Sequence, residues 1–241
     1  GDCNFEQSFC TWINMAGDQF DWIRGSGSTA SSFTGPSRDR LGSSSGYYVF
    51  IETSSPRRQG DKARLLSQQF NGTNAGSCFT FWYHMYGGTI GTLNLYQVVG
   101  QTETLIWTLS GNKGNSWFSG QVPVGKKLFN GYKVCQNHGV DVIISIFSDL
   151  IIYEILPPAE RIFCILCDSF LISCYFEISI IAEGVRGSSY TGDIAIDDFK
   201  VLNGVSCSII PTNADPNSPT TSAPVTTVPP TTTPARKYTL V

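Results

Sequence analysis

The residues that first suggest chemistry are a serine-rich run and two histidines. Gly42-Ser43-Ser44-Ser45-Gly46 matches the G-x-S-x-G pattern around the nucleophile of many hydrolases. That pattern requires a sharp strand-to-helix turn, whereas this run precedes an apolar segment with strand character. Only His84 and His138 could act as the base, and His84 lies in an apolar strand pattern where a packed side chain is expected. We therefore expect no catalytic residues and no enzyme activity.

A second group of side chains has the spacing of zinc ligands. Cys135 and His138 form one pair, and Cys164 and Cys167 form another. The second pair lies in an apolar run that lacks the turn residues of zinc sites, and no strand-to-helix context supports a redox Cys-x2-Cys motif. We expect neither chemistry here.

The acids near the end of the chain favour a cation site instead. Ile194 and Ile196 share one face of a predicted strand, whereas Phe199 requires the opposite parity. A β-bulge near Asp197 and Asp198 would account for the change and would turn a carboxylate inward. A buried carboxylate must be hydrogen-bonded or bound to a metal. The alternative is that these acids cap backbone amides or lie in solvent.

The elements that would position these residues are β-strands. Apolar residues recur with period two in 79–86, a Gly87-Gly88 turn follows, and 93–96 resumes the pattern. The same pattern predicts strands at 47–52, 104–109 and 175–181. No segment has an amphipathic helical period, and 24 glycines with 12% aromatic residues suit strands and turns. We expect an all-β fold in which two antiparallel sheets form a jelly-roll sandwich.

Charge and cysteine content indicate the compartment and exclude one class of partner. The net charge is −3, and the 16 Lys and Arg residues are scattered, so we expect no nucleic-acid partner. Eight cysteines and an N-glycosylation signal at Asn71-Gly72-Thr73 indicate an oxidising, extracellular setting. The chain starts at Gly1 without a signal peptide, so we expect a processed or excised piece.

Two hydrophobic stretches, 140–156 and 162–182, raise the question of a membrane span. Asp149 and Glu154 interrupt the first stretch, and Asp168 and Glu177 interrupt the second. Because charged residues are rare inside spanning segments, we expect no membrane insertion by this chain.

Several short blocks occur in an order that suggests a known family. They are Cys3-Asn4-Phe5-Glu6, Cys10-Thr11-Trp12, Phe20-Asp21-Trp22, Gly35-Pro36-Ser37, Gly60-Asp61-Lys62-Ala63-Arg64-Leu65-Leu66-Ser67, Cys78-Phe79-Thr80-Phe81-Trp82-Tyr83-His84-Met85-Tyr86-Gly87, Gly91-Thr92-Leu93, Gly111-Asn112, Asn115-Ser116-Trp117, Glu183-Gly184-Val185-Arg186-Gly187 and Gly192-Asp193-Ile194-Ala195-Ile196-Asp197-Asp198. This order resembles the MAM family, named for meprin, the A5 antigen and receptor phosphatase mu. The resemblance covers about 1–125 and 175–207.

The resemblance implies a non-catalytic module of extracellular proteins that mediates adhesion or oligomerisation. Its partner would be an extracellular protein, a second copy of the chain included. Two alternatives remain open. A glycan-binding, lectin-like sandwich is one, because similar jelly rolls bind sugars near a cation, and a non-catalytic exosite of a missing protease domain is the other. Fold alone does not separate them.

The cysteines divide into four within the family-like blocks and four outside them. Cys3, Cys10, Cys78 and Cys207 allow three pairings. The resemblance implies Cys3 with Cys10, which closes a small ring, and Cys78 with Cys207, which ties a central strand to the end of the domain.

The resemblance also extends the cation hypothesis to other acids. Glu6 and Asp61 lie in blocks where MAM-like domains carry acids. We predict a structural Ca²⁺ that uses some of Glu6, Asp61 and Asp198, with Asp197 as the alternative if the bulge falls one residue earlier.

Two segments depart from the family-like domain 1–207. Residues 206–241 hold 9 Thr and 7 Pro, so we expect 208–241 to be a mucin-like stalk or linker, as in zonadhesin-like adhesive proteins. Residues 126–174 intervene where MAM-like sequences have a short connection, and compact domains seldom hold such long loops. This segment is rich in residues with pyrimidine-rich codons, and Gly125-Lys126-Lys127 can encode a splice donor. We predict a translated intron, with a genuine insertion as the rival hypothesis.

Overall fold

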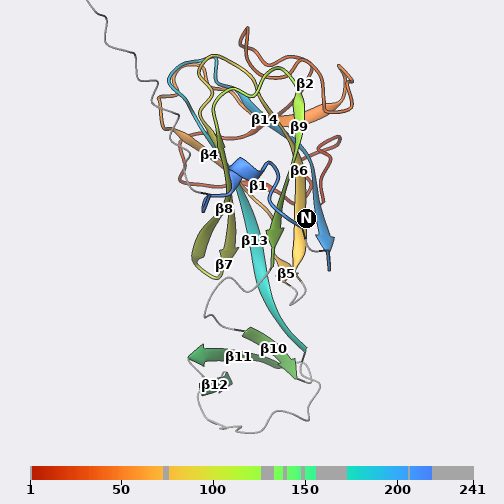
Figure 1. The fold of residues 1–241 in the computed structure, drawn as a ribbon, viewed down its shortest axis with the longest axis vertical. Coiled ribbons are helices and arrows are strands. Elements are labelled where there is room, and N and C mark those ends of the chain that lie inside the picture. Colours follow the sequence, from red (N-terminus) through yellow and green to blue (C-terminus); the bar gives the residue numbers. More distant parts are fainter. Residues whose placement is uncertain are drawn as a thin grey trace, which may run out of the picture.

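The computed structural model describes residues 2–72, 76–125, 133–137, 140–147, 150–155, 173–205 and 207–218. They form two antiparallel sheets that pack face to face (Figure 1). In spatial order, the first sheet contains β1 (Ile13–Asn14), β4 (Lys62–Leu66), β13 (Ser173–Val185), β7 (Thr92–Val99) and β8 (Thr102–Ser110), with β5 (Phe70–Gly72) also paired to β13. The second contains β2 (Ile23–Ser26), β3 (Tyr47–Ile51), β14 (Ile194–Asn203), β6 (Ser77–Met85) and β9 (Trp117–Val124).

The chain crosses repeatedly between the sheets, for example from β3 to β4, from β8 to β9 and from β13 to β14. Within the described residues there is no α-helix, only the short 3-10 helix η1 (Thr212–Ala214). The predicted all-β jelly-roll sandwich is therefore confirmed.

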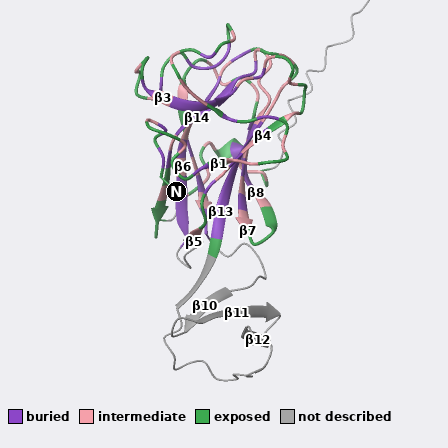
Figure 2. Ribbon diagram, turned by 180° about the vertical axis from the view of Figure 1, so that it is seen from behind, coloured by how far each residue is buried: buried purple, intermediate pink, exposed green. Residues whose placement is uncertain are grey.

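Period-two alternation explains why these segments become strands with a shared core. On β6, Phe79, Phe81 and Met85 point inward and are buried. The ring of Phe199 on β14 lies 5.2 Å from that of Phe79 and 4.4 Å from that of Trp12, measured between ring centroids. Figure 2 shows buried residues along both sheets. Burying each side chain of this size contributes roughly 1.5–3 kcal/mol, so this aromatic layer is a substantial source of stability.

The predicted β-bulge is present on β14. The pairing of β14 with β6 shifts between Asp197 and Lys200, and Asp198 has a φ of 49°. This extra residue lets Ile194, Ile196 and then Phe199 all enter the core despite their different parity.

Part of the segment 126–174 forms strands beyond the end of the sandwich. These are β10 (Lys133–Asn137), β11 (Val140–Phe147) and β12 (Leu150–Ile155), and β10 pairs with the start of β13 (Figure 1). The described parts of both hydrophobic stretches are thus strands. In the part of the chain that the structure describes, no helix is long and apolar enough to cross a membrane.

The folded part continues past Cys207, the predicted end of the sandwich domain. Ile210 pairs with Gln121 through two backbone hydrogen bonds, and its carbonyl accepts the indole N–H of Trp107 at 2.9 Å. Ala214 is fully buried. Apolar residues at the start of the tail therefore complete the core. In composition this stretch differs from the Thr/Pro-rich sequence after it.

Candidate interaction site at one edge of the sandwich

Residues 15–21, here called the edge loop, join one edge of the sandwich to the other sheet. The loop leaves β1, the edge strand of the first sheet, and enters β2, the edge strand of the second. Asn14 fixes its two ends, because its side-chain amide donates to the Trp22 carbonyl at 3.0 Å and its amide oxygen accepts the Trp22 N–H at 2.9 Å. Trp22 is itself buried, and its indole N–H donates to the carbonyl of Ala63 at 3.0 Å.

The edge loop is also fastened along the backbone of β4. The Asp18 carboxylate accepts the Arg64 N–H at 2.7 Å, and the Gln19 side-chain oxygen accepts the Lys62 N–H at 3.0 Å. Burial raises the pKa of Asp18, although the hydrogen bond from Arg64 opposes this shift. The unpaired backbone groups of an exposed sheet edge are thereby satisfied, and the outer surface of the loop is left for contact.

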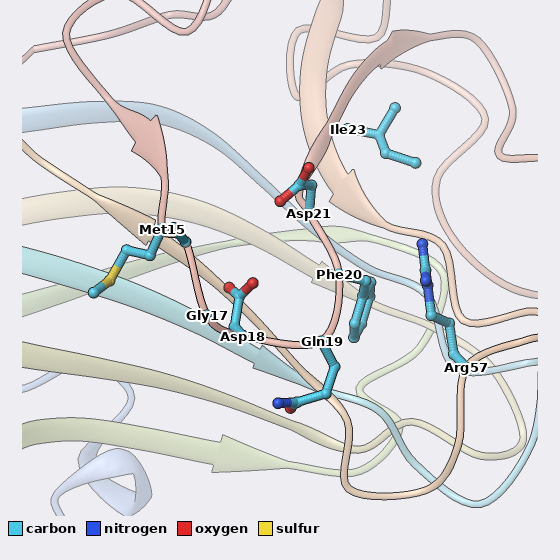
Figure 3. Close-up of a pocket in the computed structure, with 9 residues that line it drawn as sticks. Met15, Gly17, Asp18, Gln19, Phe20, Asp21, Ile23 and Arg57 are labelled. Atoms are coloured by element: carbon cyan, nitrogen blue, oxygen red, sulfur yellow. The ribbon is translucent and has the colours of Figure 1, made fainter.

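A hollow of about 580 Å³ opens on the outer side of the edge loop (Figure 3). Ile23 and Arg57 line it together with the loop. The Arg57 guanidinium lies 4.9 Å from the centroid of the Phe20 ring. Ile23 is 43% exposed, and Ile13, next to the Asn14 clamp, is 59% exposed. The hollow therefore combines the exposed aliphatic side chain of Ile23 with the charged groups of Asp18, Asp21 and Arg57.

A smaller hollow of about 280 Å³ lies on the other side of the edge loop, over a buried charge. Glu183 is 2% exposed, and its carboxylate lies 3.3 Å from the Lys62 ammonium and 3.2 Å from the Arg64 guanidinium. Asn94 and the Tyr96 hydroxyl also donate to it. Burial and then the charge of Glu183 raise the pKa of Tyr96. These charged groups satisfy one another, so this hollow has a structural role.

The acids predicted to bind calcium do not form one group. Glu6 accepts the N–H of Tyr47, at the start of β3, at 3.2 Å. Asp61 accepts the Arg58 N–H at 2.7 Å, and its backbone pairs with Arg186, whose side chain reaches the residues after β3. The contacts therefore place Glu6 and Asp61 near opposite ends of β3 and do not bring them together, and calcium binding by either acid stays a prediction.

Asp197 and Asp198 lie at the bulge, near the Glu6 end of β3. Asp197 is buried and accepts the N–H groups of Asp198 at 2.7 Å and of Arg40 at 3.4 Å. Asp198 forms an ion pair with the Arg40 side chain. Burial, and then the charge of Asp198, raise the pKa of Asp197 to about 7, and Asp39, which the sequence analysis missed, adds to the shift.

The contacts of Asp197 and Asp198 show whether their oxygens are available to a metal ion. Arg40 already supplies a positive charge to Asp198, and protein N–H groups occupy the oxygens of Asp197. Among the residues that the structure describes, no group of three or more His, Cys, Asp or Glu side chains could hold a metal ion. The arrangement thus supports capping of backbone amides, and calcium binding by Glu6, Asp197 or Asp198 stays a prediction.

The four cysteines in the family-like blocks form two disulfides. Cys3 is bonded to Cys10 and Cys78 to Cys207, with Cα–Cα distances of 5.8 and 5.7 Å. This is the pairing that the resemblance implied. Cys3 also pairs through its backbone with Phe199 of β14, so the small ring is fixed to the central strand of the second sheet.

The other candidate residues have structural roles or lie outside the residues that the structure describes. The serine run leads into β3 and not into a helix, so the elbow of a serine hydrolase is missing. His84 is buried, and its Nε2 lies 3.0 Å from the side-chain oxygen of Asn115. His138, Cys164 and Cys167 lie outside the described residues, as do the side chains of Cys135 and Asn71.

The sequence analysis missed the edge loop because its signal is weak. Asn14, Asp18 and Gln19 surround Gly17 in a short polar stretch without periodicity. Gly17 with Asp18 does indicate a turn, and Gly17 has a φ of 92°, but nothing local shows that the adjacent polar side chains pair with β4.

Two packed sheets, a satisfied edge and two disulfides define an extracellular β-sandwich domain, which confirms the predicted location. Residues 3–136 match the family described as MAM domain, meprin/A5/mu. The chain belongs to the MAM domain family. Members of this family are extracellular adhesion-type modules.

Similar proteins with this domain are much longer than the chain. It is 36% identical over 210 residues to MAM domain-containing glycosylphosphatidylinositol anchor protein 1 of Gallus gallus, which covers 84% of this chain and 17% of that protein. It is 35% identical over 218 residues to anchor protein 2 of Mus musculus, with 84% and 18% covered. It is 32% identical over 206 residues to MAM domain-containing protein 2 of Homo sapiens, with 85% and 23% covered.

Among solved structures, the K1 cleaved adhesin domain of Lys-gingipain from Porphyromonas gingivalis W83 superimposes with a TM-score of 0.46 at 11% identity, over 83% of this chain and 96% of that one. The family 11 carbohydrate-binding module from Clostridium thermocellum gives 0.37 at 10% identity, over 83% and 94%. Likeness at this level carries no functional argument.

Proposed function

We propose that the chain is a non-catalytic protein–protein interaction module of a larger multidomain protein, which is membrane-anchored or secreted and acts in cell adhesion. Membership of the MAM family supports this proposal. The chain spans 17% of the length of the first relatives it matches, and their names include a glycosylphosphatidylinositol anchor. We further propose that the Thr/Pro-rich sequence after Ser218 is a mucin-like stalk that holds the domain away from its anchor.

One observation carries the proposal of a protein partner, and that is the surface of the edge loop. Ile23 exposes an aliphatic side chain there, and Asp18, Asp21 and Arg57 line the same hollow. Protein interfaces commonly have an apolar centre with a polar rim. The clamps on the loop hold this surface in shape before any partner binds, which reduces the entropic cost of association.

The same surface is poorly suited to the glycan-binding alternative. The only aromatic ring that lines the hollow belongs to Phe20, which is 6% exposed and lies under Arg57. Small-molecule sites combine accessible apolar or aromatic groups with a few converging polar groups that fix the ligand. The polar side chains of Asp18 and Gln19 are instead committed to β4. We therefore favour a protein partner, either another chain or a second copy.

Bead aggregation with the full chain tests the proposal. Beads that carry the wild type are expected to cluster with one another or to bind cells that display the partner. Replacing Ile23→Asp should weaken binding at least tenfold, because a charge would enter the apolar centre of the contact. Leu202→Asp is a matched control, since Leu202 is also 43% exposed but lies on β14 away from the edge loop.

Two outcomes would contradict the proposal. If Ile23→Asp and Leu202→Asp bind as the wild type does, the edge loop is not the contact surface. If beads bind only glycans on an array and no protein or cell surface without them, the lectin-like alternative is correct.

A further inference from the structure

The register of two neighbouring strands places two acids directly opposite each other. Ile51 pairs with Ile194 where β3 and β14 lie antiparallel. Glu52 follows Ile51 and Asp193 precedes Ile194, so continuing the same register makes these acids a cross-strand pair. Directly opposed residues have Cβ atoms about 4.5–5.5 Å apart, and like charges in that position destabilise a sheet. This pair therefore needs a compensating charge.

Each carboxylate is held in place through one of its two oxygens. Asp193 is fully buried, and its Oδ1 accepts both the backbone N–H and the hydroxyl of Thr53 at 3.0 Å. Glu52 Oε1 accepts the Ser31 hydroxyl and the Ser54 N–H, both at 3.1 Å. Neither side chain is free to turn toward solvent without breaking these bonds.

The second oxygen of each acid is buried without a partner. In the described part of the protein, neither Glu52 Oε2 nor Asp193 Oδ2 accepts a hydrogen bond, and no ion pair involves either residue. The side chain of Arg186, which directly follows β13, donates instead to the carbonyls of Thr53 and Gly187. A buried carboxylate oxygen without a partner is costly, and here the two acids that carry such oxygens are opposed across the register.

The surroundings of the two acids supply further oxygen atoms. The Thr29 side chain has a hydrogen-bonding interaction with the Asp193 carboxyl group that favours its charged form, and its hydroxyl donates to the Thr34 carbonyl at 3.2 Å. The Thr34 hydroxyl fixes the Asp193 backbone by accepting its N–H at 2.9 Å. Carboxylate, hydroxyl and carbonyl oxygens are the ligands of hard divalent cations, and calcium tolerates irregular sets of them.

We propose that Glu52 Oε2 and Asp193 Oδ2 are the carboxylate ligands of one divalent cation of the calcium class. The two negative charges match one such ion. The site lies at the opposite end of β3 from Glu6 and Asp197, so it is distinct from the cation site predicted from the sequence. A bound ion ties the loop after β3 to the loop before β14.

The test uses the full chain, secreted with its disulfides, in CaCl2 or in EGTA. Calorimetric titration with CaCl2 should show one binding event that Glu52→Gln and Asp193→Asn each abolish. The melting temperature of the wild type should rise by about 5 °C or more at a hundredfold excess of calcium over its Kd. MgCl2 should give a smaller shift, because Mg²⁺ demands stricter octahedral geometry.

Without the ion, Glu52→Gln should have the opposite effect on the melting temperature. In EGTA it should melt above the wild type, because one of two opposed charges is gone, whereas in CaCl2 the wild type should melt higher. Glu6→Gln is the control, and it must retain the binding event assigned to Glu52 and Asp193. The proposal is overturned if Glu52→Gln binds calcium with the wild-type stoichiometry, or if magnesium stabilises the wild type as strongly as calcium does. Glu52 is only partly buried, so this variant remains informative if Asp193→Asn does not fold.

Discussion

At the scale of single residues, His84 shows how burial decides protonation. Its ring packs against Trp117 at 5.4 Å, and its Nδ1 is buried without a partner in the described part of the chain. Burial lowers the pKa of His84 to about 4, although the hydrogen bond with Asn115 opposes this shift. The imidazole is therefore neutral in the folded protein, which is unsuited to charge-dependent binding but suits a packed position.

The burial of His84 should be visible in the pH dependence of the free energy of unfolding. The unfolded His84 binds a proton near pH 6.5 and the folded one only near pH 4, so the free energy of unfolding should fall as pH drops from 6.5 to 4, by up to about 3 kcal/mol. Above pH 6.5 the residue should have no effect. Urea unfolding of the wild type and His84→Gln between pH 4 and 8 measures this, and the variant should lack that part of the slope.

The wild type must be compared with His84→Gln because two acids change the free energy of unfolding with pH in the opposite direction. Burial raises the pKa of Asp193 to about 6 and of Asp197 to about 7. Their folded forms hold protons that the unfolded chain has released, so their contribution falls as pH rises from about 4 to 7. If His84→Gln and the wild type differ equally at pH 4 and pH 7, His84 does not titrate as described.

At the scale of elements, the Asn14 clamp should be a main support of the edge loop beside its bonds to β4. Asn14→Ala removes both hydrogen bonds to Trp22 and should cost about 1–3 kcal/mol, because a buried donor and acceptor lose their partners. It should also weaken bead binding, since the contact surface loses its fixed shape. Asn112→Ala is the control, because Asn112 caps only an exposed turn at Gly114.

Hydrogen exchange gives the corresponding local measurement. In Asn14→Ala, the amides of Met15 and Gln19, which bond to β4, should exchange faster than in the wild type. Equal exchange rates in both proteins would mean that the bonds to β4 alone hold the loop and that the clamp is dispensable.

The segment 126–174 is the part of the chain whose deletion should disturb the sandwich least. Among the described residues, its strand pairing with the rest of the domain is the pair of Val134 in β10 with Tyr175 in β13, the strand into which the segment continues at Ser173. The central part of β13, from Ser179, pairs with β7 and β4 instead. Replacing the segment with a short Gly/Ser linker should preserve the Cys78–Cys207 bridge and improve secretion, because apolar sequence and four further cysteines are removed.

Two results would show that the segment belongs to the domain. One is unfolding of the shortened protein. The other is that all spliced transcripts encode residues 126–174, which would exclude translated intron and leave the genuine insertion.

At the scale of the whole molecule, the two disulfides should differ in their effect on stability. The Cys78–Cys207 bridge has a sequence separation of 129 and the Cys3–Cys10 bridge one of 7. In the chain-entropy account these separations correspond to about 5 and about 2.4 kcal/mol. The double variant Cys78→Ala/Cys207→Ala should therefore lose about twice as much stability in urea as Cys3→Ala/Cys10→Ala.

Peptide mapping under non-reducing conditions checks the pairing itself. It should recover peptides linked through Cys3 with Cys10 and through Cys78 with Cys207. A dominant bridge from Cys78 to Cys135, Cys164, Cys167 or Cys174 would contradict the pairing and the stability difference that depends on it.

The sequence by itself determined the class of fold and several of its parts. Period-two alternation in 79–86 predicts β6, and the parity change after Ile196 predicts the bulge, because side chains alternate strictly along a strand. Blocks of residues from Cys3 to Asp198 identified the family. These signals are local, or they are carried in the order of residues along the chain.

Only the tertiary structure decided which distant residues meet. Asp61 and Glu6 appeared equivalent in the sequence, yet the course of β3 places them at opposite ends. Glu52 and Asp193 are opposed because β3 pairs with β14, a register that no local pattern encodes. Asp18 and Gln19 become structural because the loop passes along β4. Strand pairing joins residues far apart in the chain, so the partners of a polar side chain depend on topology and not on its neighbours in sequence.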